Sequence, residues 1–358
     1  MPSMPRTEER EIERARALRA ELAERIARHL PRDGRHEAAP GLFLIRYSLP
    51  AGPIYAVSEP SFCIIVQGRK ELLLGRERYG YDASRYLLTS VGLPLVGHII
   101  EASKERPYLA VRLVLDPAIV TAVLMETGLL ASRTDAAVKA MAVSRLDASL
   151  LDSVVRLVRL VDAPRDYAAL APLAAREIVY RLALGEQGGR LRQMAAGGGR
   201  AHRISKAIEL LRKDYDRPLH IANLARKLGM SVSGLHHRFK AVTAMSPLQF
   251  QKHLRLQEAR RLLLAGDLDA ATAGYRVGYD DPSHFSREYK RLFGGPPRRD
   301  VAALRGAVAG RPEPAAKVRA WANAPPGALG RQAHDRSAFG PSKARCDVKN
   351  RCESWSWT

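Results

Sequence analysis

The sequence is poor in cysteine. Its 358 residues include three cysteines, Cys63, Cys346 and Cys352. Three cysteines cannot form a complete set of disulfides, and none of them has the Cys-x-x-Cys spacing that is typical of a zinc site. We therefore expect a protein of a reducing compartment, without a disulfide framework and without a cysteine-built metal site.

Long apolar runs are also absent. No stretch approaches the roughly 18 consecutive apolar residues that indicate a membrane-spanning helix. The N-terminus carries charged residues where a signal peptide would have its apolar core. We therefore predict a soluble, cytoplasmic protein with no membrane partner.

Acidic residues are scarce relative to basic ones. The sequence has 58 Lys and Arg against 37 Asp and Glu, which gives a formal net charge of +21. The excess is uneven, because residues 200–305 contain 21 basic and 10 acidic side chains, while the residues before Arg200 are nearer to balance. A generally basic proteome would raise the charge everywhere. The concentration of charge therefore favours a polyanion as the partner of this segment.

Residues 218–297 contain one pattern twice. In the first copy, apolar residues recur at helical spacing from Ile221 to Leu228, Gly229 ends that helix, and Ser231 is a good N-cap for the next one. The apolar stripe of the following helix consists of Val232, Leu235 and Phe239.

The second copy repeats this arrangement around Gly278, with a first helix lined by Ala270, Ala273, Gly274 and Val277 and a second helix striped by Phe285, Tyr289 and Phe293. A small residue, Ala225 or Gly274, lies four positions before each turn glycine, as two steeply crossing helices require. One long helical pattern, from about Pro247 to Leu264, joins the copies. The sequence therefore predicts two helix-turn-helix motifs on one connector.

This segment resembles the DNA-binding domain of the AraC/XylS family of transcription regulators. Two runs carry the resemblance, LARKLGMS at residues 224–231 and VGYDDPSHFSREYKRLFG at residues 277–294. The resemblance implies double-stranded DNA and RNA polymerase as partners.

Residues 41–116 change to short strands separated by turn residues. The predicted strands are Leu42–Ile45, Phe62–Val66, Glu71–Leu74, Tyr86–Thr89, Val96–Ile100 and Tyr108–Leu115. Many short strands at this spacing favour a sandwich or a barrel. The region, including residues 59–61, 66–70 and 105–109, is also similar to the AraC-type regulator N-terminal domain. That resemblance implies a cupin-like barrel that receives a small organic effector.

The predicted barrel contains too few histidines to bind a metal ion. His98 is the single histidine between Gly41 and Asp116, and one imidazole does not make a metal site. We therefore expect neither a metal nor another cofactor, and no cupin-type enzyme. His98 is either a satisfied strand residue or a contact of the effector.

Alternation along the last predicted strand puts Leu109, Val111, Leu113 and Leu115 on one face and Tyr108, Ala110, Arg112 and Val114 on the other. Arg112 is either an exposed strand residue or a buried cation. In the second case it would need an anionic partner, such as a carboxylate of the effector.

The whole chain is predicted to be an α+β multidomain protein, with an N-terminal cupin-like β-barrel and flanking helices and a C-terminal all-α domain of two helix-turn-helix motifs joined by a long helix. The predicted parts are an N-terminal helix and lead-in (1–40), the regulatory domain (41–184), a glycine-rich flexible linker (185–199), the DNA-binding domain (200–305) and a disordered tail (306–358). Within the regulatory domain, a helix from Asp147 to Val161 has apolar residues at steps of four, three and four. That helix either lies on the barrel or forms the seam of a homodimer.

Recognition helices read base edges with their outward side chains. In the first copy Leu235 and Phe239 are predicted to point inward, so Ser233, His236 and His237 face out. Inward Phe285 and Tyr289 leave Ser283, His284, Ser286 and Arg287 facing out in the second. These positions match the base-reading positions of the family. Arg287 is the best candidate for direct readout, because a guanidinium binds guanine O6 and N7 together. The predicted phosphate contacts are Arg238, Lys240, Lys290 and Arg291.

Two other function classes compete with that of a regulator. One is an enzyme fused to the DNA-binding module, such as an alkyl-transfer repair protein, which needs an activated thiolate. Cys63 lies in an apolar strand pattern, where thiols are usually inert, so the sequence predicts no enzyme. The other is a nonspecific architectural DNA binder, which footprinting would separate from a regulator because discrete protected sites are expected only of the latter.

Overall fold

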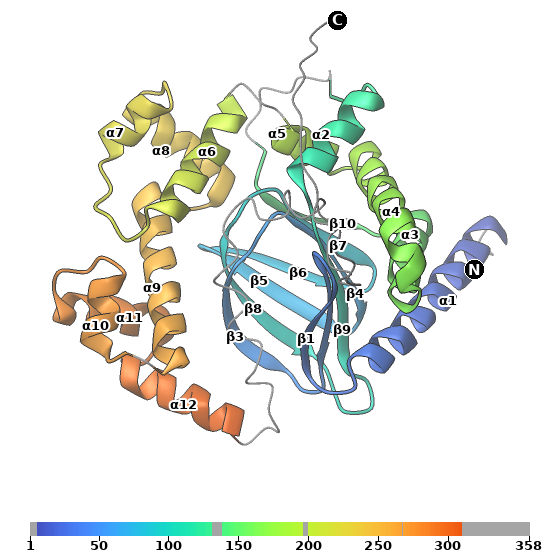
Figure 1. Ribbon diagram of the computed structural model, residues 1–358, viewed down its shortest axis with the longest axis horizontal. Helices are drawn as coiled ribbons and strands as arrows, with labels where there is room; N and C mark the ends of the chain where they lie inside the picture. The colour runs from blue at the N-terminus through green and yellow to red at the C-terminus, as the bar shows by residue number, and fades with distance from the viewer. Residues whose placement is uncertain (1–5, 131–137, 196–199, 267, 310–358) are drawn as a thin grey trace, which may run out of the picture. The chain divides into compact units, whose positions relative to one another are not determined.

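A computed structural model describes residues 6–130, 138–195, 200–266 and 268–309. Within these residues, ten strands of the N-terminal region form two antiparallel sheets, one of six strands in the order β1-β2-β9-β4-β7-β10 and one of four in the order β3-β8-β5-β6 (Figure 1). Their bounds are β1 Gly34–Ala39, β2 Leu42–Tyr47, β3 Ala51–Val57, β4 Ser61–Gln67, β5 Arg69–Leu74, β6 Glu77–Asp82, β7 Arg85–Thr89, β8 Pro94–Glu101, β9 Tyr108–Val114 and β10 Met141–Arg145.

All six predicted strands are confirmed, and four further strands, β1, β3, β6 and β10, were not predicted. Gly52 and Pro53 in β3 and Gly80 in β6 are turn-type residues, yet both strands pair in the four-stranded sheet. The register of β3 against β8 shifts between Ala51 and Ile54, and this irregularity accommodates Gly52 and Pro53. The β-rich domain is therefore as predicted, but the described strands lie in two separate sheets and do not close into a barrel.

The two faces of β9 alternate as the sequence predicted. Leu109, Val111 and Leu115 are buried in one apolar cluster with the helices that cover the six-stranded sheet. Tyr108 and Ala110 are buried in a second cluster with Cys63 and residues of the four-stranded sheet. The odd-numbered side chains therefore point to the helices, and the even-numbered side chains point to the space between the sheets.

The covering helices are α1 Arg6–His29, α2 Pro117–Glu126, α3 Ala148–Arg159, α4 Pro164–Leu184 and α5 Gly188–Ala195, with a short 3₁₀ turn η1 at Leu160–Asp162. Leu150, Val154 and Leu157 of α3 are at most 3% exposed and belong to the same cluster as Leu22 and Ile26 of α1. These three residues of the predicted seam therefore pack inside the chain, which supports the reading in which α3 lies on its own domain.

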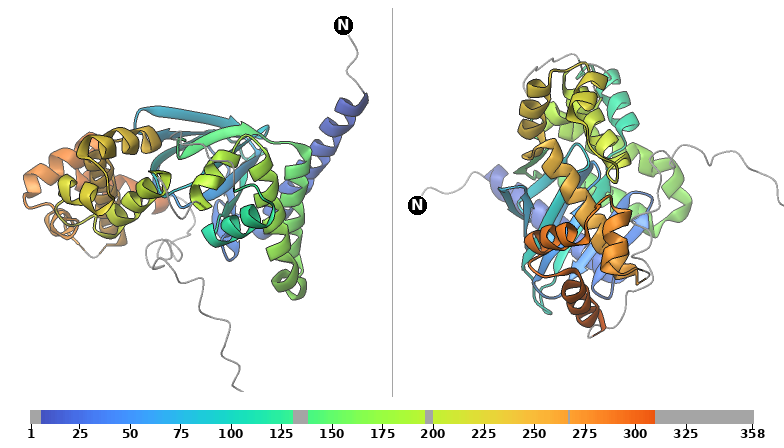
Figure 2. Two further views of the ribbon diagram at one scale, coloured as in Figure 1. Left: turned by 90° about the horizontal axis from the view of Figure 1, so that it is seen from above. Right: turned by 90° about the vertical axis from the view of Figure 1, so that its left-hand side faces the viewer.

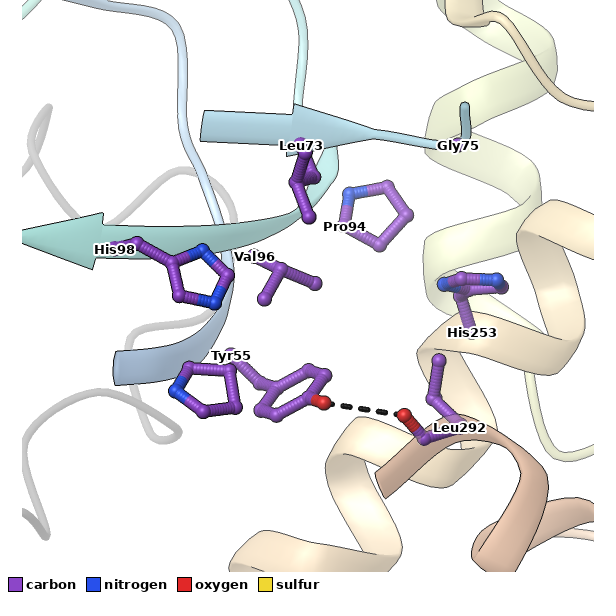
Figure 3. A pocket seen from close by; sticks show the side chains of 9 residues that line it. Tyr55, Leu73, Gly75, Pro94, Val96, His98, His253 and Leu292 are labelled. Atoms are coloured by element: carbon purple, nitrogen blue, oxygen red, sulfur yellow. Dashed lines mark hydrogen bonds between the residues drawn. The ribbon is translucent and has the colours of Figure 1, made fainter. Parts of the chain in front are cut away.

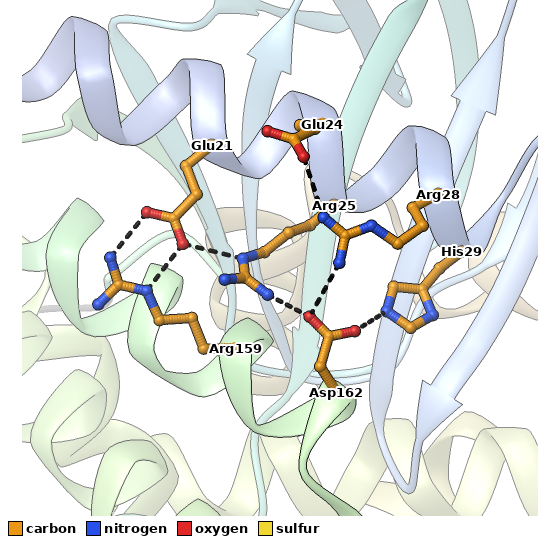
Figure 4. A network of polar contacts seen from close by, with 7 residues as sticks. All are labelled: Glu21, Glu24, Arg25, Arg28, His29, Arg159 and Asp162. Carbon is orange, nitrogen blue, oxygen red and sulfur yellow. Dashed lines mark hydrogen bonds and ion pairs between the residues drawn. The ribbon is translucent and has the colours of Figure 1, made fainter.

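Charged groups fasten α1 to α3 and η1 (Figure 4). Arg159 donates two hydrogen bonds of 2.7 Å to the Glu21 carboxylate, and Arg25 donates a third of 2.9 Å. His29 is 2.6 Å from Asp162, which also pairs with Arg25 and Arg28. The hydrogen bond from Arg159 is the main reason that the pKa of Glu21 falls to about 2, so this carboxylate stays ionised at any physiological pH.

The C-terminal region is helical, as predicted. Its helix α9 runs between the pair α7–α8 and the pair α10–α11 (Figures 1 and 2). The bounds are α6 Arg200–Lys213, α7 Ile221–Lys227, α8 Val232–Thr243, α9 Pro247–Ala265, α10 Ala270–Arg276, α11 Pro282–Phe293 and α12 Pro297–Ala309. No helix in the described residues has the length and hydropathy needed to cross a bilayer.

Two boundary features differ from the predictions. The segment predicted as a flexible linker contains α5, because Leu191 and Ala195 are buried against α2 and α4 and stabilise a helix there; residues 196–199 lie outside the described residues. The predicted tail starts at 306, but α12 continues to Ala309. The rest of the predicted tail, with Cys346 and Cys352, also lies outside the described residues.

Candidate nucleic-acid interface

The first helix-turn-helix is built around Gly229. This glycine has φ +59° between α7 and α8, and the Ser231 hydroxyl caps α8 by accepting a hydrogen bond of 3.1 Å from the Gly234 N–H. Leu235 and Phe239 are fully buried, and the Phe239 ring packs edge-to-face on Phe250 of α9 with centroids 5.4 Å apart. The predicted inward positions of Leu235 and Phe239 in α8 are confirmed, whereas Val232 of the predicted stripe is 44% exposed.

The second helix-turn-helix has the same construction with a different cap. Gly278 has φ +87°, and the Asp281 carboxylate accepts hydrogen bonds from the N–H groups of Ser283 and His284 at 2.8 and 3.2 Å. Phe285 and Tyr289 are fully buried. A Cβ on Gly274 would lie 3.0 Å from Cγ of Phe285, so the small residue makes room for the crossing of α10 and α11.

The predicted base-reading side chains lie on the outer parts of α8 and α11. Ser233, His237, Ser283, His284 and Arg287 are exposed, and His236 and Ser286 are half-buried. The two faces differ in chemistry. One presents a hydroxyl and two imidazoles, and the other presents two hydroxyls, an imidazole and a guanidinium.

The predicted phosphate contacts differ in their surroundings. Lys240 and Lys290 are exposed, and Arg238 is half-buried. Arg291 donates a hydrogen bond of 3.1 Å to the buried Glu288 carboxylate, whose other oxygen lies 2.7 Å from the Lys252 ammonium. Lys290 is therefore the better test of a phosphate contact on α11, because Arg291 already has an anionic partner.

Arg255 of α9 connects the turn of the second helix-turn-helix to the segment that follows α6. This contact was not predicted from the sequence. Its guanidinium donates hydrogen bonds of 2.7–3.2 Å to the carbonyls of Tyr215, Asp216 and Arg217, which follow α6, and one of 2.7 Å to the carbonyl of Gly278. One side chain thus fixes the second turn against the end of α6. Its sequence signal, an arginine one residue after the apolar position Leu254, is too common to have identified it.

Replacing Arg255 by methionine keeps the length of the side chain and removes all four hydrogen bonds. We expect a loss of about 1.5–3 kcal/mol in the free energy of unfolding, because hydrogen bonds to a charged group are worth this much and water can reach part of the site. Chemical denaturation measures it. Arg276→Met, at an exposed position of α10, is the control and is expected to change stability by no more than about 0.5 kcal/mol. Equal losses in both variants would contradict the role of Arg255.

The N-terminal domain contacts both recognition helices near their C-terminal ends. The carbonyl of Val242 in α8 accepts a hydrogen bond of 2.9 Å from the N–H of Ala140, beside β10. Tyr55 of β3 donates a hydrogen bond of 3.1 Å to the carbonyl of Leu292 in α11, and its ring packs against Phe293 with centroids 4.6 Å apart. The two regions are therefore joined by direct contacts as well as by the segment predicted as a flexible linker. Apolar residues of the N-terminal sheets and of α6 to α9 also belong to one buried cluster.

A second unpredicted cluster lies beside this contact. Arg260 of α9 donates two hydrogen bonds, of 2.7 and 2.6 Å, to the Asp300 carboxylate, which also accepts one of 2.8 Å from the Tyr289 hydroxyl. The guanidinium carbon of Arg260 lies 4.6 Å from the ring centroid of Tyr55 and 4.5 Å from that of Phe293. The cluster connects α9, α11 and α12 with the N-terminal domain.

The two candidate effector residues lie on different faces of the sheets. The Arg112 side chain is 11% exposed and donates a hydrogen bond of 3.2 Å to Glu59, and Phe43 lies opposite it on β2. Its reading as an exposed strand residue is therefore wrong. His98 lines a cavity with His253 of α9 (Figure 3), and its buried Nδ1 has no hydrogen-bond partner in the described residues. Its reading as a fully satisfied strand residue is also wrong.

The described residues contain no group of three or more His, Cys, Asp or Glu side chains that could hold a metal ion. Cys63 is a buried free thiol that accepts a hydrogen bond of 3.5 Å from the Tyr81 hydroxyl.

Each of the two regions matches a known protein family. Residues 38–190 match the family described as the AraC-type transcriptional regulator N-terminus, and residues 224–301 match a helix-turn-helix domain family. The chain is similar to the HTH-type transcriptional activator RhaS of Pectobacterium carotovorum subsp. carotovorum, with 27% identity over 106 residues, 30% of this chain and 38% of that protein. It is also similar to RhaS of Citrobacter koseri, with 29% identity over 167 residues, 46% of this chain and 58% of that protein.

The chain thus covers less than two thirds of the length of either relative. Among solved structures, ToxT from Vibrio cholerae O395 bound to (E)-4-(8-methylnaphthalen-1-yl)but-3-enoic acid is similar over 73% of this chain and 97% of that one, with 13% identity and a TM-score of 0.49. The two RhaS relatives are named as transcriptional activators, which are regulators and not enzymes. The two family matches, with the two helix-turn-helix units, show that this chain belongs to the AraC family of transcriptional regulators.

Proposed function

We propose that this protein is a sequence-specific transcription regulator that binds one asymmetric DNA site and is controlled by a small organic molecule bound by its N-terminal domain. The observation that carries the proposal is the fixed pair of helix-turn-helix units on α9, with different side chains on the two reading faces. A rigid connector suits two successive major grooves, which lie about 34 Å apart on one face of the duplex. One chain then needs no palindrome, because its two half-sites differ.

The base contacts and the phosphate contacts would have different roles. Ser233, His236 and His237 of α8 and Ser283, His284, Ser286 and Arg287 of α11 would read bases. Arg238, Lys240, Lys290 and Arg291 would neutralise phosphates, which strengthens binding to every sequence.

The proposed effector acts through the contact between the two regions. Arg112 remains a candidate for a carboxylate of the effector in the space between the sheets, and His98 remains a candidate on the outer face. Since the N-terminal domain holds the ends of α8 and α11, a ligand that alters this contact would alter the placement of the recognition helices.

Other partners follow from the family. RNA polymerase and a second copy of this chain are the proteins that a regulator of this kind would contact. The names of the RhaS relatives support activation over repression.

Replacing Arg287 by alanine tests the direct readout. We expect a loss of about 1–3 kcal/mol in binding free energy and relaxed base preference in one half-site only, because the bidentate contact to a guanine is removed. The measurement is a binding titration with every single-base variant of a site that footprinting of the full chain identifies.

Lys290→Ala on the same helix is the matched control. It should weaken all sequence variants alike and lower the slope of log K against log salt by about one. If Arg287→Ala also weakened all variants equally, Arg287 would be a phosphate contact. Footprints without discrete protected sites would favour an architectural DNA binder.

A further inference from the structure

The two helix-turn-helix units differ in charge. Residues 221–243 of the first unit contain four Lys or Arg side chains and no Asp or Glu, whereas residues 270–293 of the second contain four Lys or Arg and three Asp or Glu. The formal net charge is therefore +4 for the first unit and +1 for the second. Because the DNA backbone carries one negative charge per phosphate whatever its sequence, the first unit has the stronger sequence-independent attraction to DNA.

Arg203 of α6 lies at the turn of the first unit. Its Nη1 donates a hydrogen bond of 2.8 Å to the carbonyl of the turn glycine, Gly229, and the residue is exposed. The cap of α8, Ser231, follows this glycine by two residues. The guanidinium of Arg203 is therefore held beside the N-terminal end of α8, the end with which recognition helices approach the base edges.

Most of the hydrogen-bonding capacity of Arg203 is unused. A guanidinium has five N–H groups, and the Gly229 carbonyl engages one of them. Among the described residues, no carboxylate forms an ion pair with Arg203, nor with Arg226 or Lys227, the two cations that precede the turn. A planar guanidinium with several free N–H groups suits the oxygens of a phosphate. The first turn thus presents cations that have no anionic partner in this part of the chain.

The second turn has different surroundings. Arg255 reaches its glycine carbonyl, but this arginine is half-buried and also donates to the carbonyls of residues 215–217. Asp280 and Asp281 follow Gly278 almost directly, and both are exposed. Their negative charges oppose the approach of a phosphate. An arginine therefore bonds each turn glycine, but only the one at the first turn is free to contact an anion.

We propose that the turn of the first helix-turn-helix is a phosphate-binding site in which Arg203 contacts the DNA backbone, and that the second turn makes no such contact. The Gly229 carbonyl orients the guanidinium before DNA arrives, so less side-chain entropy is lost on binding. This inference rests on the proposed function. It adds a contact from α6, a helix that precedes both helix-turn-helix units.

Replacing Arg203 by methionine in the full chain tests the contact. We expect the Kd for the footprinted site to rise about tenfold at 50 mM salt and about threefold at 200 mM, because the loss of one phosphate contact changes the ratio of the two Kd values roughly 3.5-fold over this range. The slope of log K against log salt should fall by about one, and every single-base variant of the site should be affected alike. Fluorescence anisotropy titrations at several salt concentrations measure both quantities.

Two controls remove one exposed cation each. Lys213→Met changes the same helix ten residues further on, roughly 15 Å along the axis, which exceeds the Debye length of about 10 Å at 0.1 M salt. Arg276→Met changes a position two residues before the second turn glycine. Each should leave the slope within about 0.3 of that of the parent. A fall of about one for Lys213→Met would show a general charge effect, and the same fall for Arg276→Met would show a phosphate contact at the second turn; either result overturns the proposal.

Arg203→Lys separates the phosphate contact from support of the turn. Lysine keeps the charge, so we expect the slope to return to within about 0.3 of the parent value, with a smaller rise in Kd than for methionine. A different pattern would assign Arg203 to the turn alone: an unchanged slope in Arg203→Met, with altered base preference only at the positions that α8 reads. That pattern overturns the proposal.

The parent protein distinguishes failure of this proposal from failure of the proposed function. If the parent gives discrete footprints and salt-dependent affinity while Arg203→Met keeps the parent slope, only the contact of Arg203 is overturned. If the parent shows no salt-sensitive DNA affinity, the proposed function fails and the contact of Arg203 fails with it.

Discussion

Replacing Asp300 by alanine is expected to lower the free energy of unfolding by about 3–5 kcal/mol. Arg260 and Asp300 each have side chains that are 11% exposed, and they form a bidentate pair with bonds of 2.6 and 2.7 Å. Removing the carboxylate leaves a buried guanidinium without its anion, and uncompensated buried charges are among the most destabilising single changes. The Tyr289 hydroxyl also loses its acceptor. Urea or guanidinium denaturation of the full chain measures the loss.

Two further variants make this prediction specific. Asp300→Asn keeps the shape and part of the hydrogen bonding, so its loss should lie between that of alanine and zero. Asp280→Ala, at an exposed position before α11, should change stability by no more than about 0.5 kcal/mol. A loss below about 1 kcal/mol for Asp300→Ala would show that Arg260 finds another partner or is hydrated, and would contradict the role of this cluster.

Replacing Gly278 by alanine is expected to cost about 3–5 kcal/mol. The residue has φ +87°, which strains any L side chain, and its Cβ would lie 1.9 Å from the carbonyl oxygen of Asp216 and 2.8 Å from Nη2 of Arg255. Since the nearest atom belongs to the backbone, the turn and the end of α6 must separate. Overpacking of this kind adds about 1–3 kcal/mol to the conformational strain. DNA affinity should fall as well, because the Arg255 hydrogen bonds that align the two units are displaced.

The first turn supplies the matched control. Gly229 has φ +59°, and a Cβ there would meet no atom within 4 Å. Gly229→Ala should therefore cost only the strain of the left-handed conformation, about 1–2 kcal/mol. Thermal or chemical unfolding of the two variants side by side measures the difference. Equal losses would mean that strain alone acts at both turns and that the contact of Gly278 with Asp216 has no energetic role.

Much of the DNA-binding region followed from the sequence alone. Local patterns define it: a turn glycine, a capping Ser231 or Asp281, and apolar residues at helical spacing form each helix from neighbours in the chain. The buried positions of Leu235, Phe239, Phe285 and Tyr289 were predicted for this reason. Six strands were predicted on the same basis, because alternation and flanking turn residues are also local signals.

Other parts of the fold depended on partners distant in sequence. β3 and β6 contain residues that disfavour strands, and they form because β8 and β5 supply hydrogen bonds along their edges. α5 replaces part of a predicted linker because α2 and α4 bury Leu191. Whether the sheets stay open or close into a barrel likewise depends on which edge strands form hydrogen bonds with each other.

The sequence by itself determined the two helix-turn-helix units, the outward side chains of α8 and α11 and the β-rich character of the N-terminal domain, because each depends on residues a few positions apart. Only the tertiary structure decided what holds these parts together. Arg255 reaches carbonyls 23 to 40 positions away, Arg260 bonds Asp300 40 positions away, and His98 meets His253 in one cavity. Such contacts leave no periodic trace in the sequence, since either partner alone looks like an ordinary helix or strand residue. Their strength depends on a buried, low-dielectric environment, which exists only once the chain has folded.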